Sequence, residues 1–151
     1  MKSMSSPSVL RLSLSAVVAT LLAGSLALPA CAQDTMIKVD PVHATKYLNG
    51  GIGSGEQQHM RAAAKDWPLK MIFSERKNDE FVANVDVRVM DARDHVVLDL
   101  QKAGPMTYAM LPSGTYRITA SFNGVSETHQ VKVRGNSTPD VYFHWSGGHQ
   151  S

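Results

Sequence analysis

The sequence predicts a mainly β protein, a two-layer antiparallel β-sandwich of about seven strands with one short N-terminal helix. Three observations carry this prediction. After residue 66 the chain is a series of short segments that alternate apolar and polar residues and are separated by turn residues, as in a β-sandwich. Asn123-Gly124 is a strong signal for a tight hairpin. Only one stretch, residues 54–67, has the composition of a helix.

Residues 1–32 have the layout of a secretory signal peptide. Lys2 and Arg11 provide a positively charged start, and residues 12–28 are almost entirely apolar or small. This run is too short, and too diluted by Ser, Thr and Gly, for a membrane-spanning helix, which needs about 20 apolar residues. Residues 30–32 (Ala-Cys-Ala) fit the small-x-small pattern of a cleavage site. We therefore expect a periplasmic or secreted protein.

Cys31, the only cysteine, allows a second interpretation of the same segment. Residues 28–31 (LPAC) can be read as a lipobox, which would make Cys31 an acylated N-terminus that anchors a lipoprotein in the membrane. Pro29 fits the middle of a lipobox poorly. Cleavage after Ala32 would instead leave 119 of the 151 residues, without a cysteine and hence without disulfides.

The charge balance argues against a nucleic-acid partner. The full chain has 15 basic and 13 acidic residues, and removal of Lys2 and Arg11 leaves 13 of each. Because contacts to the phosphate backbone dominate nucleic-acid binding, a protein with no basic excess is not expected to bind it.

The helix belongs to an N-terminal segment, residues 33–66, that precedes the sandwich. Ser54 is the expected N-cap, and Gln57 three residues later completes a capping box. Three consecutive alanines favour the helix, and Pro68 ends it.

Residues 67–146 are expected to form one sandwich domain. Residues 69–75 are apolar on nearly both faces, as in a central strand. Clean alternation marks three more strands, at residues 85–89, 96–100 and 116–122. The corner at residues 91–94 (DARD) is expected to form an Asx turn rather than a calcium site.

The Asn123-Gly124 turn also predicts the register of its hairpin, because a type I′ turn leaves a two-residue loop. The expected cross-strand pairs are Phe122 with Val125, Ala120 with Glu127, Ile118 with His129, and Tyr116 with Val131.

The last strand, residues 141–145, is expected to bury alternate side chains. Its inward residues are Val141, Phe143 and Trp145, and its outward residues are Tyr142 and His144. Residues 147–151 are expected to be a disordered tail.

The motif LPSGTY, residues 111–116, predicts a turn followed by a tyrosine corner. Pro112 and Gly114 occupy the positions that a type I turn favours. Tyr116 then enters the core with its hydroxyl near the turn backbone, because a buried phenol needs a hydrogen-bond partner.

Residues 83–124 resemble the carboxypeptidase regulatory-like domains, which are transthyretin-like (prealbumin-like) β-sandwiches related to the immunoglobulin architecture. The resemblance rests on the alternating valine strand, the Asp-x-x-Asp corner and LPSGTY, and it covers residues 69–145. Residues 47–75 look like the N-terminal half of small exported proteobacterial proteins built from one such domain. The resemblance implies a fold and a non-catalytic accessory role, but no established activity.

Four side chains are candidate ligand-binding residues: Tyr142, His144, Trp67 and Trp145. β-Sandwich binding modules often present aromatic planes to sugars, so a flat aromatic platform is one hypothesis. Trp145 shares the buried phase of its strand, and Trp67 can pin the helix to the sheet. A structural role for these two tryptophans therefore remains open.

No pattern predicts a metal, a cofactor or a catalytic group. The six histidines lack tight ligand spacing and are not supported by an HExxH helix. Glu127 and His129 share one face and are either a functional pair or two solvated residues at a hairpin tip. There is no GxSxG elbow. Transthyretin-like hydrolases should end in YRGS, whereas this chain ends in FHWSGGHQS.

We therefore expect a monomeric, exported module of the cell envelope that binds or scaffolds a protein or a glycan and is not an enzyme. Recognition is expected either at the face of Tyr142 and His144 or at the loop end with DARD and LPSG. An exposed strand edge could also take up a partner peptide. A carbohydrate-binding module is the alternative. A small hydrolase is the third hypothesis and requires a converging Ser/His/Asp or paired-acid cluster.

Overall fold

The structure of this chain is a computed structural model that describes residues 37–76 and 79–146. The predicted signal peptide, with Cys31, and the predicted tail, residues 147–151, lie outside the described residues. No helix in the described part of the chain is both long and apolar enough to cross a membrane.

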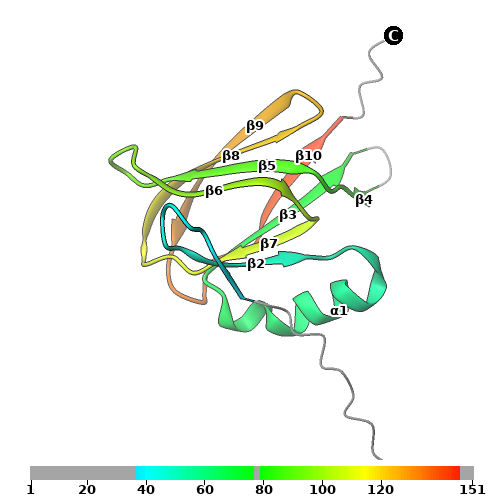
Figure 1. The fold of residues 1–151 in the computed structure, drawn as a ribbon, viewed down its shortest axis with the longest axis horizontal. Helices are drawn as coiled ribbons and strands as arrows, with labels where there is room; N and C mark the ends of the chain where they lie inside the picture. The colour runs from blue at the N-terminus through cyan, green and yellow to red at the C-terminus, as the bar shows by residue number, and fades with distance from the viewer. Residues whose placement is uncertain (1–36, 77–78, 147–151) are drawn as a thin grey trace, which may run out of the picture. The chain divides into compact units, whose positions relative to one another are not determined.

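The fold is mainly β and consists of two sheets, which confirms this part of the prediction (Figure 1). The first sheet has the order β1-β2-β7-β3-β10, and β4 pairs with β3. Its strands are β1 (Lys38–Val39), β2 (Lys46–Gly50), β3 (Leu69–Glu75), β4 (Glu80–Phe81), β7 (Met106–Ala109) and β10 (Val141–Trp145). The second sheet has the order β6-β5-β8-β9. Its strands are β5 (Val85–Met90), β6 (Val96–Ala103), β8 (Gly114–Phe122) and β9 (Val125–Val133).

Two features of the sheets differ from the prediction. Strand β10 pairs parallel with β3, so antiparallel pairing throughout was wrong for this pair. The chain leaves the second sheet after β9 and returns to the first, where it enters beside β3 in the same direction. The described residues also form ten strands rather than about seven, partly because β1 and β4 are two residues long and too short to give a sequence pattern.

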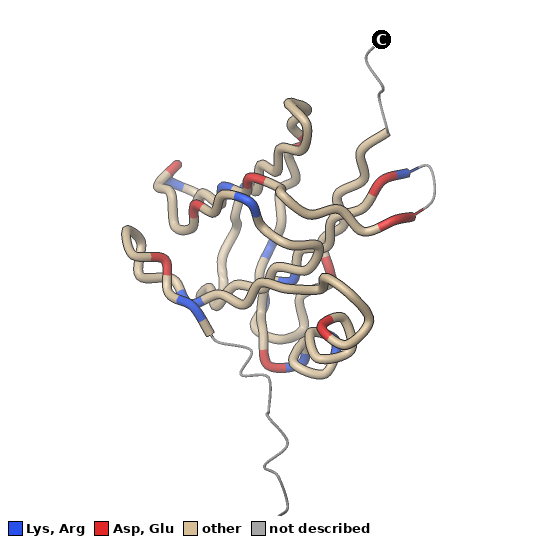
Figure 2. The backbone as a smooth tube through the Cα atoms, turned by 45° about the vertical axis from the view of Figure 1, so that its right-hand side comes forward, with Lys and Arg blue, Asp and Glu red and all other residues tan. Residues whose placement is uncertain are grey.

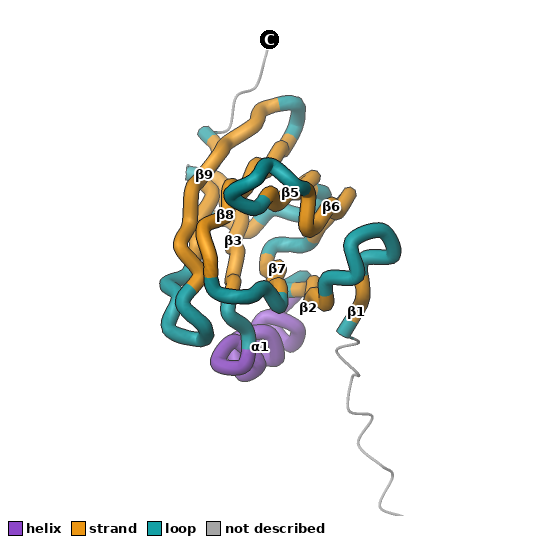
Figure 3. The backbone as a smooth tube through the Cα atoms, turned by 90° about the vertical axis from the view of Figure 1, so that its left-hand side faces the viewer, coloured by secondary structure: helices purple, strands orange, loops and turns teal. Residues whose placement is uncertain are grey.

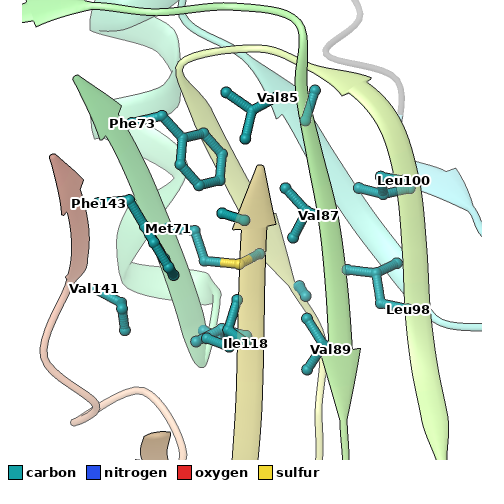
Figure 4. Close-up of a cluster of buried hydrophobic side chains, with 14 of the residues drawn as sticks. Met71, Phe73, Val85, Val87, Val89, Leu98, Leu100, Ile118, Val141 and Phe143 are labelled. Atoms are coloured by element: carbon teal, nitrogen blue, oxygen red, sulfur yellow. The ribbon is translucent and has the colours of Figure 1, made fainter. Parts of the chain in front are cut away.

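The main core lies between the two sheets. Figure 4 shows Met71 and Phe73 of β3 and Phe143 of β10 pointing toward Val87 of β5 and Ile118 of β8. Each of these side chains is at most 1% exposed. The alternation read from the sequence therefore placed the correct faces inward.

A second, smaller hydrophobic cluster lies on the outer face of the first sheet. Helix α1 (Gly53–Ala63), which continues as a 3₁₀ turn (Ala64–Asp66), covers this face (Figure 3). Met60 and Trp67 pack there with Leu48, Met106 and Tyr108. Strand β3 is consequently buried on both faces, as its apolar sequence predicts.

The helix begins differently from the prediction. Its N-cap is Ile52 and makes no side-chain cap bond, so the capping box of Ser54 and Gln57 was wrong. Instead, Glu56 Oε2 accepts the backbone N–H groups of Gly51 (3.1 Å) and Ile52 (3.0 Å). A carboxylate satisfies two donors at once and also interacts favourably with the positive end of the helix.

The hairpin of β8 and β9 has the predicted register. Asn123 and Gly124 have φ values of 50° and 79°, the positive values that a type I′ turn requires. All four predicted cross-strand pairs are formed.

The predicted tyrosine corner is also confirmed. Tyr116 is 7% exposed, and its hydroxyl donates to the carbonyl oxygen of Pro112 (2.8 Å). Burial, followed by the nearby Asp91 carboxylate, raises the pKa of Tyr116, so the phenol stays protonated as a donor.

The DARD corner forms the expected Asx-type turn. Asp91 Oδ1 accepts the backbone N–H groups of Arg93 (2.8 Å) and His95 (3.0 Å). The hydrogen bond from His95 is the main reason that the pKa of Asp91 is lowered.

The β1–β2 connection ties the two sheets together along one side. The buried carboxylate of Asp40 accepts the backbone N–H of Asp99 in β6 (3.1 Å). Thr45 Oγ1 donates to the carbonyl oxygen of Val97, also in β6 (2.5 Å). Side chains of the β1–β2 connection thus satisfy backbone groups on the open edge of the second sheet.

Strands β9 and β10 close the opposite side, although they belong to different sheets. Trp145 Nε1 donates to the carbonyl oxygen of Val125 (3.0 Å). The backbone N–H of His144 donates to Glu127 Oε2 (3.2 Å). Side chains, rather than a backbone ladder, join the two strands here.

Candidate binding site

Tyr142 and His144 project from the outer face of β10, away from the core. The strand alternates as predicted, and Tyr142 is 49% exposed. The two rings are parallel within 2°, and their centroids are 6.0 Å apart. These two predicted candidate residues therefore form one aromatic surface, named below the Tyr142–His144 surface.

Neighbouring residues hold His144 in place through both its ring and its backbone. Ser74 lies opposite it on β3, and Ser74 Oγ is 2.7 Å from His144 Nδ1. Glu127 accepts its backbone N–H, and Arg76 Nε donates to its carbonyl oxygen (3.1 Å). The His144 half of the surface is therefore held in place before any ligand arrives, which lowers the entropy cost of binding.

A groove of about 640 Å³ borders this surface and is named below the β9–β10 groove. One wall comes from residues 129–132 and 134, at the end of β9, and the other from residues 137 and 139–142, which lead into β10. Tyr142 lies at the boundary of the groove and the Tyr142–His144 surface.

A buried lysine supports the segment that forms the second wall. Lys70 of β3 is 8% exposed, and its Nζ donates to the carbonyl oxygen of Thr138 (3.1 Å). The same Nζ is 3.5 Å from Asp140 Oδ1 and 3.5 Å from the carbonyl oxygen of Trp67. Sequence reasoning missed Lys70, whose only signal was a charged residue inside an otherwise apolar strand.

Tyr108 of β7 lies in the same region and is 2% exposed. Burial raises its pKa to about 12. The negative charge of Asp140 and the presence of Tyr142 act in the same direction, and Arg61 opposes them. The phenol is therefore neutral at physiological pH and available as a hydrogen-bond donor.

The two predicted tryptophans lie apart from this surface. Trp67 is 4% exposed and belongs to the cluster under α1. Trp145 is 4% exposed and belongs to the main core, where it contacts Phe73 and Phe122. The structure brings Tyr142 and His144 together but gives both tryptophans the packing role that the sequence left open.

Glu127 and His129 form a direct pair. Their side chains are 26% and 37% exposed, and His129 Nε2 lies 2.6 Å from Glu127 Oε1. The His129 ring packs edge-on against Phe143, with centroids 4.5 Å apart. The pair is therefore partly covered by β10. Glu127 contacts His129 through Oε1 and accepts the backbone N–H of His144 at Oε2.

Ser74 and His144 have the distance of a nucleophile and its base, but in the described part of the chain the hydroxyl is buried and the carboxylate of a triad is missing. Ser74 is only 4% exposed. Within residues 37–76 and 79–146, no carboxylate hydrogen-bonds to the His144 ring. In the same ranges no three His, Cys, Asp or Glu side chains gather as a metal site. The arrangement is suited to hydrogen bonding and ring stacking.

A second groove, of about 570 Å³, lies at the loop end with DARD and LPSG, the other recognition surface expected from the sequence. Residues of the DARD and LPSG loops line it, together with residues 43–46. Met110 at its edge is 44% exposed. This groove has no exposed aromatic ring comparable to Tyr142 among its lining residues.

The sequence matches no protein-family model, and a search of curated proteins finds no significant match.

Proposed function

We propose that this protein is an exported, non-catalytic binding module of the cell envelope, and that it recognises its partner at the Tyr142–His144 surface. The observation that carries the proposal is a pair of parallel rings beside an open groove, in which Tyr142 is half exposed and His144 is held by a hydrogen bond. Exposed aromatic rings with fixed orientation are typical of binding surfaces, because they offer contact area at little cost in side-chain entropy.

The architecture that we propose for this module is the transthyretin-like sandwich of the carboxypeptidase regulatory-like domains. The tyrosine corner at Tyr116 and the buried valine alternation of β5 support this assignment. The charged residues support a role in protein or glycan recognition over nucleic-acid binding, since both signs are interspersed along the chain (Figure 2).

Site-specific photocrosslinking in cells tests the location of the surface. Tyr142→p-benzoylphenylalanine places a photoreactive aromatic ring at the site, and the matched control is the same substitution at Val42, which is 79% exposed near β1. We expect ultraviolet-dependent adducts from position 142 and none of the same mass from position 42. Adducts from position 42 alone, or from neither position, would contradict the proposal.

The mass of the protein isolated from cells tests export. A chain that begins at Gln33 supports a soluble exported module, and one that begins at an acylated Cys31 supports a lipoprotein form of the same module. An intact Met1 in a cytoplasmic fraction would contradict export.

Carbohydrate binding is a second candidate, favoured by the parallel stacking of Tyr142 on His144. A sugar ring packs well against an exposed aromatic face. On a glycan array, a carbohydrate module should give a signal that Tyr142→Phe keeps and Tyr142→Ala loses. No signal on the array, together with protein adducts from position 142, would reject this candidate.

A further inference from the structure

Strand β9 presents an unpaired backbone edge. It is the last strand of the second sheet, is nine residues long and, within residues 37–76 and 79–146, pairs with β8 alone. In its two-residue hairpin, Phe122 and Val125 form the first hydrogen-bonded pair, and such pairs alternate along the ladder. The N–H and C=O groups of Gln130 and Lys132 therefore point away from β8. Figure 3 shows β9 at the margin of the fold.

Side-chain contacts tie the first half of β9 to β10. Glu127 bonds to the backbone of β10, and Trp145 bonds to the carbonyl oxygen of Val125. From Gln130 onward, the β9–β10 groove replaces these contacts. The backbone of β9 is thus accessible where the groove runs along it.

The chemistry of the groove is that of a site for an acidic, extended chain. Lys132 and Arg134 line it, are both exposed, and have no ion-pair partner among the described residues. The one acidic residue in the lining, Asp140, already lies 3.5 Å from Lys70. Val131 and Val141 supply apolar contact below.

We propose that the β9–β10 groove binds an extended acidic peptide segment of a partner protein, which adds to the edge of β9 as a further strand. This inference rests on the proposed function, because the peptide would pass beside Tyr142. Backbone N–H and C=O groups of Gln130 and Lys132 would pair with the peptide, as in β-strand addition.

The period of two along a strand sets the side-chain pattern of the peptide. Residues that pair beside Lys132 lie on the outer face of the sheet and would be Asp or Glu. Their neighbours point inward toward Val131 and Val141 and would be Val, Ile or Ala. The expected ligand therefore alternates acidic and small apolar residues.

Fluorescence anisotropy with the full purified chain tests this inference. The probe is a fluorescein-labelled peptide of four Glu-Val repeats, and the control probe has four Lys-Val repeats. We expect at least tenfold tighter binding of the acidic peptide. Because the contact is partly electrostatic, the affinity should fall as salt rises.

Two variants test the electrostatic contact and the backbone hydrogen bonds separately. Lys132→Glu should weaken binding of the acidic peptide about tenfold, which corresponds to about 1.4 kcal/mol. Its matched control, Lys38→Glu on the edge strand β1, should leave binding unchanged. Gln130→Pro removes one outward N–H at an edge position, where proline is tolerated, and should abolish binding. Circular dichroism checks that each variant remains folded, and an acidic peptide N-methylated on alternate residues gives the same backbone test without changing the protein.

The outcomes are distinct. Equal affinity for the two peptides, or full binding by Gln130→Pro and by the N-methylated peptide, would overturn the inference. So would a concentration-dependent dimer that competes with the peptide, since the edge would then serve a second copy. If position 142 crosslinks to a partner in cells but the purified protein does not bind the acidic peptide, only the inference is overturned. If neither crosslinking nor peptide binding is seen, the proposed function is overturned as well.

Discussion

At the level of single residues, Asp40 links the β1–β2 turn to the edge of β6. Its carboxylate accepts hydrogen bonds from the ring nitrogen Nδ1 of His43 (2.7 Å) and from several backbone N–H groups, including that of Asp99. Burial alone would raise the pKa of Asp40, but these hydrogen bonds outweigh it and lower the pKa to about 2. The carboxylate is therefore ionised across the physiological range.

Substitution of Asp40 should reveal this linkage as a pH-dependent loss of stability. Because the folded pKa lies below the ordinary value of 3.8, the contribution of the carboxylate is present above pH 4 and is lost as the pH falls toward 2. Asp40→Asn should lower the free energy of unfolding by about 1–3 kcal/mol at pH 7, since one of the two acceptor oxygens becomes an NH2 group that faces other N–H donors. Urea unfolding at pH 7 and pH 3 measures this, and a deficit of the same size at both pH values would contradict the assignment.

Tyr116 gives a second prediction at this scale. Tyr116→Phe removes the hydroxyl that donates to Pro112 and keeps the ring in the core. We expect a loss of about 1 kcal/mol of stability. Crosslinking at position 142 should not change, because the corner and the Tyr142–His144 surface are separate. A change in crosslinking with unchanged stability would show that the residue has a binding role instead.

At the level of elements, Lys70 connects β3 to the chain between β9 and β10. It bonds to Thr138 and lies near Asp140, at the base of one wall of the groove. Lys70→Met should therefore release residues 135–140 and leave the β8–β9 hairpin intact. Hydrogen exchange should become faster in residues 135–142 and stay unchanged in residues 116–125. Uniformly faster exchange would mean that Lys70 supports the whole fold and not this segment.

Which elements the sequence predicted depends on how local their determinants are. The β8–β9 register follows from two turn residues, and the inward faces of β5, β6 and β8 follow from alternation within each strand. The parallel pairing of β10 with β3 joins residues about 70 positions apart, and no local pattern records it. The helix start was predicted wrongly because the short-range motif at Ser54 predicts a capping box there, whereas in the structure Glu56 accepts the free N–H groups.

In the site as well, the residues that were predicted are those with local determinants. The sequence placed Tyr142 and His144 on one face because that face needs only the period of a single strand. It did not place Lys70 of β3 or Lys132 of β9 near the segment of Asp140 and Tyr142, because only the tertiary fold brings these elements together. The burial of Trp67 under α1 also depends on how the helix packs across strands.

At the level of the whole molecule, the two hydrophobic clusters meet at strand β7, which contributes Ala109 to the main core and Met106 and Tyr108 to the outer cluster. We therefore expect both clusters to unfold in one cooperative transition. The two tryptophans report on them separately, since Trp67 lies in the outer cluster and Trp145 in the main core. Trp67→Phe and Trp145→Phe each leave one reporter, and the denaturation curves should each follow far-ultraviolet circular dichroism of the same variant. A fluorescence transition at lower denaturant for the Trp67 reporter would show that α1 detaches first.

The parallel pairing of β10 also dictates when the protein can finish folding. Val141 follows Glu75 by 66 residues, so strands β4 to β9 are all synthesised after β3 and before its parallel partner β10. Until that final strand is available, Phe73 lacks its contact with the Phe143 ring, and we expect it to be accessible to chaperones. A nascent chain that ends just before Val141 should therefore stay bound by holdase chaperones. Extension of the chain through Trp145 should let β10 pair with β3 and the chaperone dissociate.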